Sequence, residues 1–131
     1  MRLKLTIPFL LLLTLTTAAP IKPEAAAGAP PPQISCMTNN RRAPVGDLIR
    51  AEQMLFSRPE ECFQWDQMTC QTHSRNGKAR ILVCRSPLFH MPCWALANIA
   101  KAIREACTTD SMVGGYWKLS PNSDGFVYVG T

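Results

Sequence analysis

The sequence predicts an α+β fold: a two-layer α/β sandwich of about four antiparallel strands, with two helices on one face and three disulfides. One observation is an amphipathic helix bounded by Cys93 and Cys107, in which apolar residues recur at helical spacing. Another is the dipeptide Asn76-Gly77 between two β-rich stretches, which is a strong hairpin signal. The predicted elements alternate as helix, hairpin, helix, hairpin. Two helices cannot cover both faces of a sheet, so we expect both on the same face.

The first 18 residues, 1–18, have the features of a secretory signal peptide. Arg2 and Lys4 give a charged start, an apolar run covers 7–17, and cleavage after Ala18 follows the small-x-small rule. The run is too short for a membrane span of ~20 residues, and no other stretch of the sequence is apolar for long enough. We therefore expect a secreted protein without a membrane span.

Residues 19–35 are rich in Pro and Ala and have little to bury, which predicts a disordered or polyproline-like lead-in. It could also be a propeptide, since Arg41-Arg42 resembles a dibasic processing site, although a solvated basic loop is the simpler interpretation. The domain is expected over 36–131. The sequence has 14 basic and 9 acidic residues, so without Arg2 and Lys4 the balance is 12 to 9, a net charge of +3. That charge is too small to indicate a nucleic-acid partner by itself, and none is expected.

Six cysteines within this domain predict three disulfides formed in an oxidising compartment. The pairing is left open by the sequence, because six cysteines allow many connectivities. Two of them flank the long helix about 21 Å apart along its axis, so they must bond to partners elsewhere. The six are Cys36, Cys62, Cys70, Cys84, Cys93 and Cys107.

The other elements follow from local signals. A short edge strand is expected over 34–37, and a first helix runs from an Asp47 N-cap to about Phe56, ahead of a proline. After the second helix, 113–120 and 126–129 are the expected last strands. The pair Gly114-Gly115 marks a bulge or the close approach of another backbone.

The hairpin around Asn76-Gly77 has a testable register. Its second arm contains the continuous apolar run Ile81–Cys84, which predicts a central strand. A two-residue turn that pairs Arg75 with Lys78 places Cys70 and Cys84 on opposite faces of the sheet. This register disfavours a Cys70–Cys84 disulfide unless a bulge shifts it.

Taken together, these features resemble small secreted cysteine-rich effectors of plant-pathogenic fungi. The run Ile81–Cys84, a helix that ends at Cys107, and Gly114-Gly115 ahead of two strands are similar to a killer-toxin-like α/β subset. The resemblance covers 36–131 as a pattern and includes no catalytic motif. It implies a protein that acts at a host interface, outside the host cell or after translocation into it, and that interferes with plant defence.

An enzymatic alternative is a secreted ribonuclease with His73 and His90 as base and acid, assisted by Glu60, Glu61 or Arg80. Nothing in the local sequence separates these histidines from ordinary loop or surface residues. The sequence has no metal-ligand spacing, no serine-hydrolase motif and no phosphate-binding glycine loop. We therefore expect a protein that is not an enzyme and that uses no cofactor or metal.

Aromatic residues suggest a second alternative, a glycan-binding surface. Trp65, Trp94, Tyr116 and Trp117 could stack on sugar rings, whereas packing in a thin core is the more common use of such residues. Strand alternation makes Tyr116 and Trp117 face opposite ways, so at most one of these two can belong to a flat platform.

The candidate partner-binding site is the basic tip of the hairpin, formed by His73, Arg75, Lys78 and Arg80. Alternation places His73 and Arg80 on one face. The tip is either a solvated edge or a contact for an acidic host protein, to which arginine would bind bidentately. The predicted function is that of a monomeric secreted virulence effector that binds a host component and suppresses plant immunity. The alternatives are a killer-toxin-like antimicrobial protein and a secreted ribonuclease.

Overall fold

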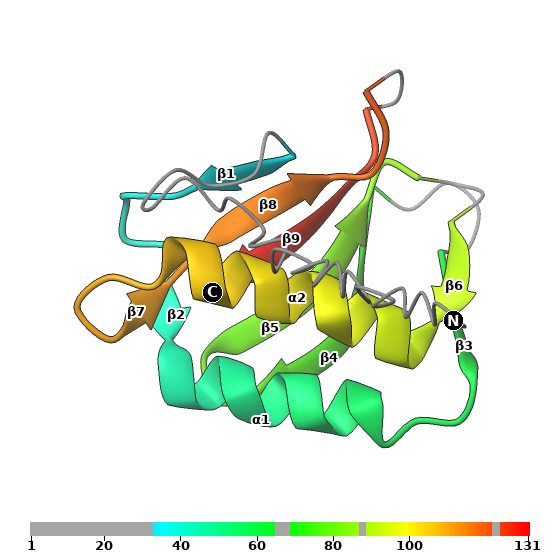
Figure 1. The fold of residues 1–131 in the computed structure, drawn as a ribbon, viewed down its shortest axis with the longest axis horizontal. Helices are drawn as coiled ribbons and strands as arrows, with labels where there is room; N and C mark the ends of the chain where they lie inside the picture. Colours follow the sequence, from blue (N-terminus) through cyan, green and yellow to red (C-terminus); the bar gives the residue numbers. More distant parts are fainter. Residues whose placement is uncertain (1–32, 65–68, 87–88, 122–123) are drawn as a thin grey trace, which may run out of the picture.

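The computed structural model describes residues 33–64, 69–86, 89–121 and 124–131 (Figure 1). The predicted signal peptide, most of the lead-in and Trp65 lie outside the described residues. The helices are α1 (Val45–Phe56) and α2 (Cys93–Cys107). The main sheet has the strand order β1 (Ile34–Cys36), β8 (Gly115–Lys118), β9 (Phe126–Gly130), β5 (Ala79–Cys84) and β4 (Cys70–Asn76). Two short ribbons pair β2 (Ala43–Pro44) with β7 (Met112–Val113), and β3 (Glu61–Phe63) with β6 (His90–Pro92).

The predicted fold class is confirmed. The main sheet is antiparallel throughout, and α1 and α2 lie side by side on one of its faces (Figure 1). It has five strands where about four were expected, with β1 at one edge and β5 at an interior position as predicted. The two ribbons were not predicted, because strands of two or three residues are too short to show an alternating pattern.

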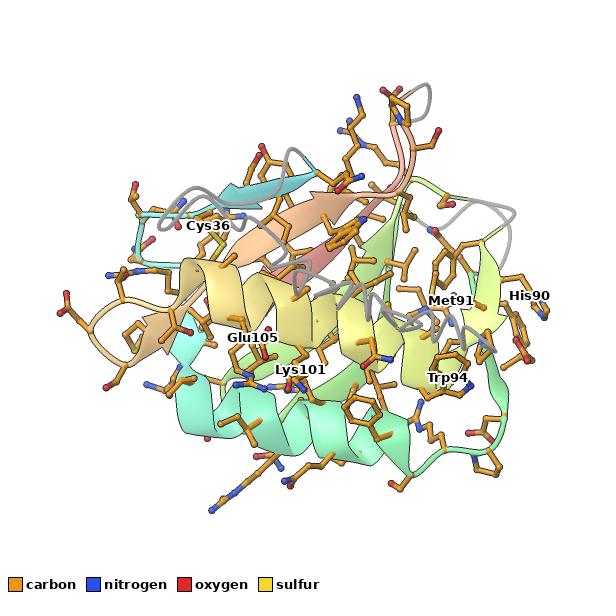
Figure 2. The ribbon with its side chains drawn as sticks, viewed as in Figure 1. Cys36, His90, Met91, Trp94, Lys101 and Glu105 are labelled. Carbon is orange, nitrogen blue, oxygen red and sulfur yellow. A yellow bond between two sulfur atoms is a disulfide. The ribbon has the colours of Figure 1, made fainter. Side chains whose placement is uncertain are left out.

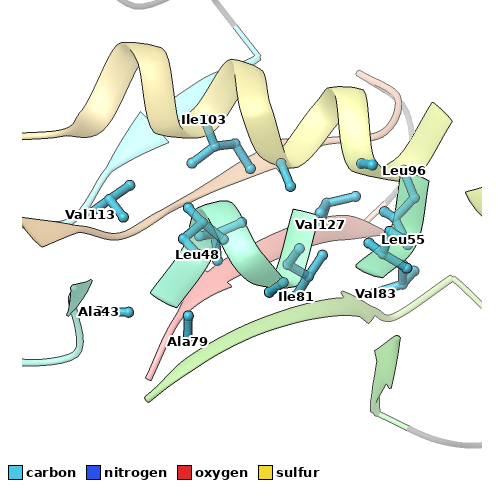
Figure 3. Close-up of a cluster of buried hydrophobic side chains, with 14 of the residues drawn as sticks. Ala43, Leu48, Leu55, Ala79, Ile81, Val83, Leu96, Ile103, Val113 and Val127 are labelled. Carbon is cyan, nitrogen blue, oxygen red and sulfur yellow. The ribbon is translucent and has the colours of Figure 1, made fainter. Parts of the chain in front are cut away.

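The core lies between the helices and the sheet (Figure 3). On β5 and β9, every second residue points toward the helices and is fully buried, and the residues between them point the other way. The apolar stripes of α1 and α2 close the core from the opposite side. Its largest fully buried aliphatic members are Leu48, Leu55, Ile81, Val83, Leu96, Ile103, Val113, Val127 and Val129.

Helix α1 begins two residues before the predicted N-cap. Pro44 occupies the cap position, and the first helical amide, that of Val45, donates to the carbonyl oxygen of Ser111 at 3.0 Å. The expectation that Asp47 caps the helix was therefore wrong. Its carboxylate instead accepts a hydrogen bond from the backbone N–H of Lys78 at 3.0 Å, which ties the hairpin turn to α1.

Three disulfides join the elements: Cys36–Cys107, Cys62–Cys93 and Cys70–Cys84. The first two attach the ends of α2 to β1 and β3, as the spacing of the helix cysteines required. The third was disfavoured by the predicted register, and that register was wrong. Asn76 pairs with Ala79 across a Gly77-Lys78 turn, and the pairing shifts between Thr72 and Ser74, so Cys70 lies directly opposite Cys84. The bulge named as the exception is present.

The predicted strand over 113–120 is divided at Gly114 into β7 and β8. A Cβ on Gly115 would lie 2.8 Å from the carbonyl oxygen of Ser35 and 3.0 Å from the sulfur of Cys107. The glycine pair thus permits the close approach of β1 and α2, as expected.

Candidate functional site: the open face of the main sheet

The helices cover one face of the main sheet, and strand alternation sends a second set of side chains to the other face. We call this second face the open face. Cross-strand pairing fixes which residues are neighbours on it. Its members are Ser35, Cys70, Thr72, Arg75, Arg80, Leu82, Cys84, Tyr116, Lys118, Phe126 and Tyr128.

An apolar band crosses the middle of the open face. Tyr116 pairs directly with Tyr128, and Tyr128 pairs with Leu82 on its other side. Phe126 lies one row away, and its ring meets the ring of Tyr116 edge to face at a centroid distance of 5.8 Å. Tyr116 is 41% exposed, so aromatic surface is accessible on the open face.

Two shallow hollows adjoin across Phe126. The larger, of about 460 Å³, is lined by Gln33, Ser35, Arg85, Tyr116, Lys118, Asp124 and Phe126. The smaller, of about 350 Å³, is lined by Arg41, Cys70, Arg80, Leu82, Cys84, Phe126, Tyr128 and Thr131. Because Phe126 borders both hollows, a ligand longer than either one could occupy the two together.

Charge is distributed unevenly between the two sides of the molecule. Four cations line the hollows, against the single acid Asp124. Arg75 adds a fifth cation, directly opposite Arg80 on the neighbouring strand. The other acids of the described chain lie on the helices or on the segments that adjoin them: Asp47, Glu52, Glu60, Glu61, Glu105 and Asp110. The open face is therefore strongly basic although the net charge of the chain is modest.

Tyr128 belongs to the apolar band and borders the basic end of the open face, where Arg41 and Arg80 lie. Burial raises the pKa of its phenol above the usual value, while Arg41 and Arg80 partly oppose that rise. The hydroxyl donates to the carbonyl oxygen of Thr131 at 3.3 Å. Tyr128 thus stays neutral at physiological pH and presents a ring with a donor beside two guanidinium groups.

The structure divides the predicted hairpin-tip site. Arg75 and Arg80 are brought together on the open face, and Lys78 is exposed in the turn. His73 is the extra residue at the bulge, so it and Ser74 both point to the helix side, where His73 is only 7% exposed. The expectation that His73 shares a face with Arg80 was therefore wrong.

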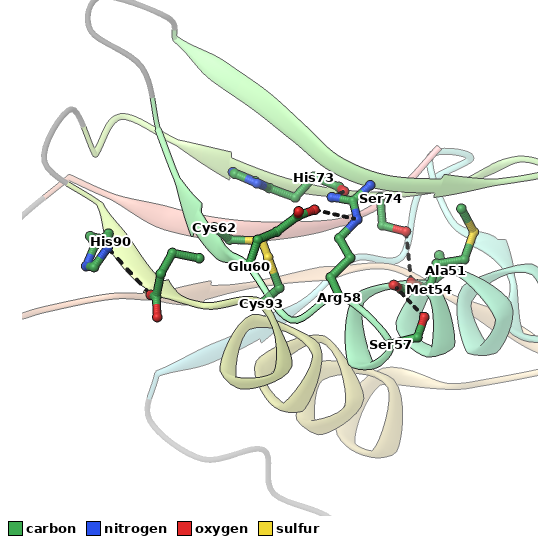
Figure 4. The surroundings of a disulfide bond; sticks show 11 residues. Ala51, Met54, Ser57, Arg58, Glu60, Cys62, His73, Ser74, His90 and Cys93 are labelled. Atoms are coloured by element: carbon green, nitrogen blue, oxygen red, sulfur yellow. Dashed lines mark hydrogen bonds and ion pairs between the residues drawn. A yellow bond between two sulfur atoms is a disulfide. The ribbon is translucent and has the colours of Figure 1, made fainter.

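His73 lies beside Arg58 near the Cys62–Cys93 disulfide (Figure 4), and its burial and contacts are those of a packed histidine. Its ring lies 6.1 Å from that of Phe89, and Arg58 donates to its carbonyl oxygen at 2.8 Å. Burial, with a smaller contribution from Arg58, lowers the pKa of His73 to about 4. His90 is exposed and its Nε2 lies 3.5 Å from Glu61. A buried histidine with a pKa of about 4 is a weak base that a substrate can hardly reach, so it fits poorly the general base that the ribonuclease hypothesis assigns to His73.

Several residues that line the two hollows were not predicted as site residues: Arg41, Arg85, Lys118, Phe126 and Tyr128. The sequence contains a signal for Phe126 and Tyr128: they alternate with valines along 126–129, so both must lie on the same face of the strand. Of the predicted stacking candidates, Tyr116 is on the open face, Trp117 packs against the core and Trp94 is exposed on α2. Arg41 and Arg85 are distant in sequence, and only the tertiary fold brings them to this face.

Among the described residues, no group of three or more His, Cys, Asp or Glu side chains is arranged to hold a metal ion. No helix within the described ranges is long and apolar enough to cross a membrane. In comparisons with protein-family models, with curated proteins and with solved structures, the chain matches none of them.

Proposed function

We propose that this chain is an exported binding module, a virulence effector that binds an anionic host component through its open face and thereby suppresses plant immunity. The observation that supports the proposal is the collection of five cations and one acid around the two adjoining hollows. Three disulfides within about a hundred residues fit an extracellular protein, because such bonds persist in oxidising compartments.

The pair Arg75 and Arg80 supports a binding role in particular. Like charges directly opposite each other on a sheet destabilise the fold, typically by a few tenths of a kcal/mol up to ~1 kcal/mol. An anionic ligand between the two guanidinium groups would reverse this repulsion. Arginine is also suited to carboxylates and phosphates, because its planar group can donate two parallel hydrogen bonds.

The proposal is tested by expressing the full chain in leaf tissue and measuring the oxidative burst triggered by flagellin or chitin. The chain should suppress the burst. An Arg75→Glu, Arg80→Glu double variant should lose most of this suppression, because it reverses the charge at one end of the open face. A matched Arg50→Glu, Lys101→Glu variant changes two exposed cations on the helices and should suppress as the parent does.

Intact mass and circular dichroism of the secreted variants establish that both remain oxidised and folded. Equal suppression by the parent and the Arg75→Glu, Arg80→Glu variant would overturn the proposal. Expression with and without 1–18 then distinguishes a partner outside the host cell from one in the cytoplasm, since the shortened chain stays inside the cell.

A further inference from the structure

We infer that the ligand of the open face is a single-stranded nucleic acid. The inference rests on the proposed function and names the chemical class of its anionic partner. Two features of the open face together support this inference: it has aromatic rings in the middle and cations at both ends.

The rings are neighbours in two directions. Tyr116 and Tyr128 are cross-strand partners, so their Cβ atoms are about 5 Å apart, and Phe126 is two residues from Tyr128 on the same face. Aromatic side chains exposed on an antiparallel sheet provide surfaces on which successive bases stack, as in sheet-based RNA-binding domains that stack two or three bases. The apolar band has the ring number and spacing for that mode of binding.

Cations flank this band on both sides along the strand direction. Arg80 and Arg41 lie beyond Tyr128. Arg41 is held near the end of β9, because its carbonyl oxygen accepts a hydrogen bond from the backbone N–H of Thr131 at 2.8 Å. Lys118 lies beside Phe126 as its cross-strand partner, and Arg85, which follows the last residue of β5, lies beyond Phe126. A backbone of phosphates entering and leaving the band would meet positive charge at each end.

A single strand of nucleic acid alternates planar rings with anions, and so matches both features. An acidic peptide supplies anions with few rings, and a neutral glycan supplies rings without anions. The net charge of the chain is too small to indicate a nucleic-acid partner by itself, but affinity for phosphates depends on the local arrangement of cations. On the open face that arrangement is five cations to one acid.

The test is fluorescence anisotropy of the oxidised full chain, secreted by a eukaryotic host, with a short labelled single-stranded RNA of mixed sequence. We expect saturable binding with Kd below about 100 µM at physiological salt. With three to five phosphate contacts, the logarithm of affinity should fall with the logarithm of salt concentration at a slope of about −2 to −3.5. The same sequence as a duplex should bind more weakly, because its bases are not free to stack.

Two open-face variants separate stacking from charge. Tyr116→Ala should weaken binding about 5- to 100-fold without a change in the salt slope, since it removes one stacking ring. Arg80→Gln should weaken binding and reduce the slope by about 0.7, the value of one phosphate contact. The matched controls are Trp94→Ala, which removes the exposed ring on α2 (Figure 2), and Arg50→Gln on α1; both should bind as the parent does.

Unlabelled poly-glutamate and polygalacturonate serve as competitors. Failure of the RNA to bind, or binding that Tyr116→Ala and Arg80→Gln leave unchanged, would overturn the inference. If labelled poly-glutamate or polygalacturonate binds instead and Arg80→Gln weakens it, the nucleic-acid inference fails while the proposed function stands. If none of the three polymers binds but the leaf assay still depends on Arg75 and Arg80, the inference likewise fails, and the proposed function remains with a different anionic partner.

Discussion

At the scale of single residues, the buried ion pair between the helices is the most sensitive contact. Glu52 is 3% exposed, and Arg104 reaches it with Nε at 2.9 Å and Nη2 at 3.0 Å. The hydrogen bonds to Glu52 raise the pKa of Arg104 above its usual value, so the guanidinium stays charged. The pair therefore joins α1 to α2 through two parallel charge-assisted bonds.

Replacing Arg104 by Met should lower the free energy of unfolding by about 3–5 kcal/mol, because it leaves the Glu52 carboxylate buried without a counter-charge. The matched variant Lys101→Met breaks an exposed pair with Glu105 and should cost less than about 1 kcal/mol. Urea denaturation of both variants measures the difference. If Arg104→Met and Lys101→Met unfold at similar urea concentrations, the loss of Arg104 does not leave Glu52 as an unpaired buried charge, and the prediction is wrong.

The lowered pKa of His73 predicts that the free energy of unfolding depends on pH. Its pKa is about 4 in the folded chain and close to 6.5 when unfolded, so the unfolded chain binds the proton first as pH falls. The stability that neutral His73 supplies is complete above pH 6.5 and is lost between about 6.5 and 4, by at most about 3 kcal/mol. The charged groups that face His73 are those of Arg58, Glu60 and Glu61, which line a third hollow together with it.

A His73→Leu variant should therefore lose less stability than the parent between pH 6.5 and 5. Denaturation midpoints measured at steps across this range provide the comparison. Parallel curves for parent and variant would contradict the lowered pKa of His73.

At the scale of elements, the hairpin turn is fitted to α1 through a glycine. Gly77 has φ of +53°, and a Cβ there would lie 2.6 Å from Cγ of Asp47, whose carboxylate accepts the Lys78 amide. A side chain at 77 would therefore meet both a strained backbone and a close neighbour. The turn and the helix position each other.

Gly77→Ala should destabilise the chain by about 1–2 kcal/mol from backbone strain alone, with a further cost from the contact with Asp47. In an Asp47→Ala background the contact is absent, so the added cost of Gly77→Ala should fall toward the strain value.

Gly46 is the matched control, since it is helical and a Cβ added there would have no neighbouring atom within 4 Å. Gly46→Ala should be neutral or stabilising by up to ~1 kcal/mol. Thermal melts of these variants and the parent measure the differences, and a destabilised Gly46→Ala would undermine the argument.

At the scale of the whole molecule, disulfides hold a thin core together. They enclose loops of very different length, with sequence separations of 71 for Cys36–Cys107, 31 for Cys62–Cys93 and 14 for Cys70–Cys84. The long bond closes β1 onto the end of α2, and the short one lies on the open face between the two hairpin arms. The open face thus depends on cross-links for its rigidity.

Replacing both cysteines of a pair by Ser should destabilise the chain in the order of loop length, by about 4 kcal/mol for Cys36–Cys107 and about 3 kcal/mol for Cys70–Cys84 in the chain-entropy model. Guanidinium denaturation of the oxidised variants measures the order. Because the Cys70–Cys84 disulfide lines the smaller hollow, its removal should also weaken ligand binding under conditions in which the variant is still fully folded. A folded, active parent with six free thiols would contradict the pairing.

The elements that could be predicted from the sequence alone are those with local signals. The stripe of α2, the turn glycine, the central strand Ile81–Cys84 and the need for α2 cysteines to bond elsewhere all follow from side-chain periodicity and chain geometry. Periodicity also settled that Tyr116 and Trp117 face opposite ways. The fold class follows from the same signals, because two helices and a sheet with one apolar face have few ways to bury their surfaces.

Which residues of different elements contact one another depends on long-range packing and could not be predicted. The bulge beside Ser74 moves His73 away from Arg80 and brings Cys70 opposite Cys84, and a bulge of one residue leaves no clear mark in local sequence. Arg41 and Arg85 reach the open face through loops whose paths depend on long-range contacts. The charge of that face was hidden in a net value of +3 because sums of charge carry no positions. The site is therefore a product of register and chain path, which the packing of the whole sheet selects.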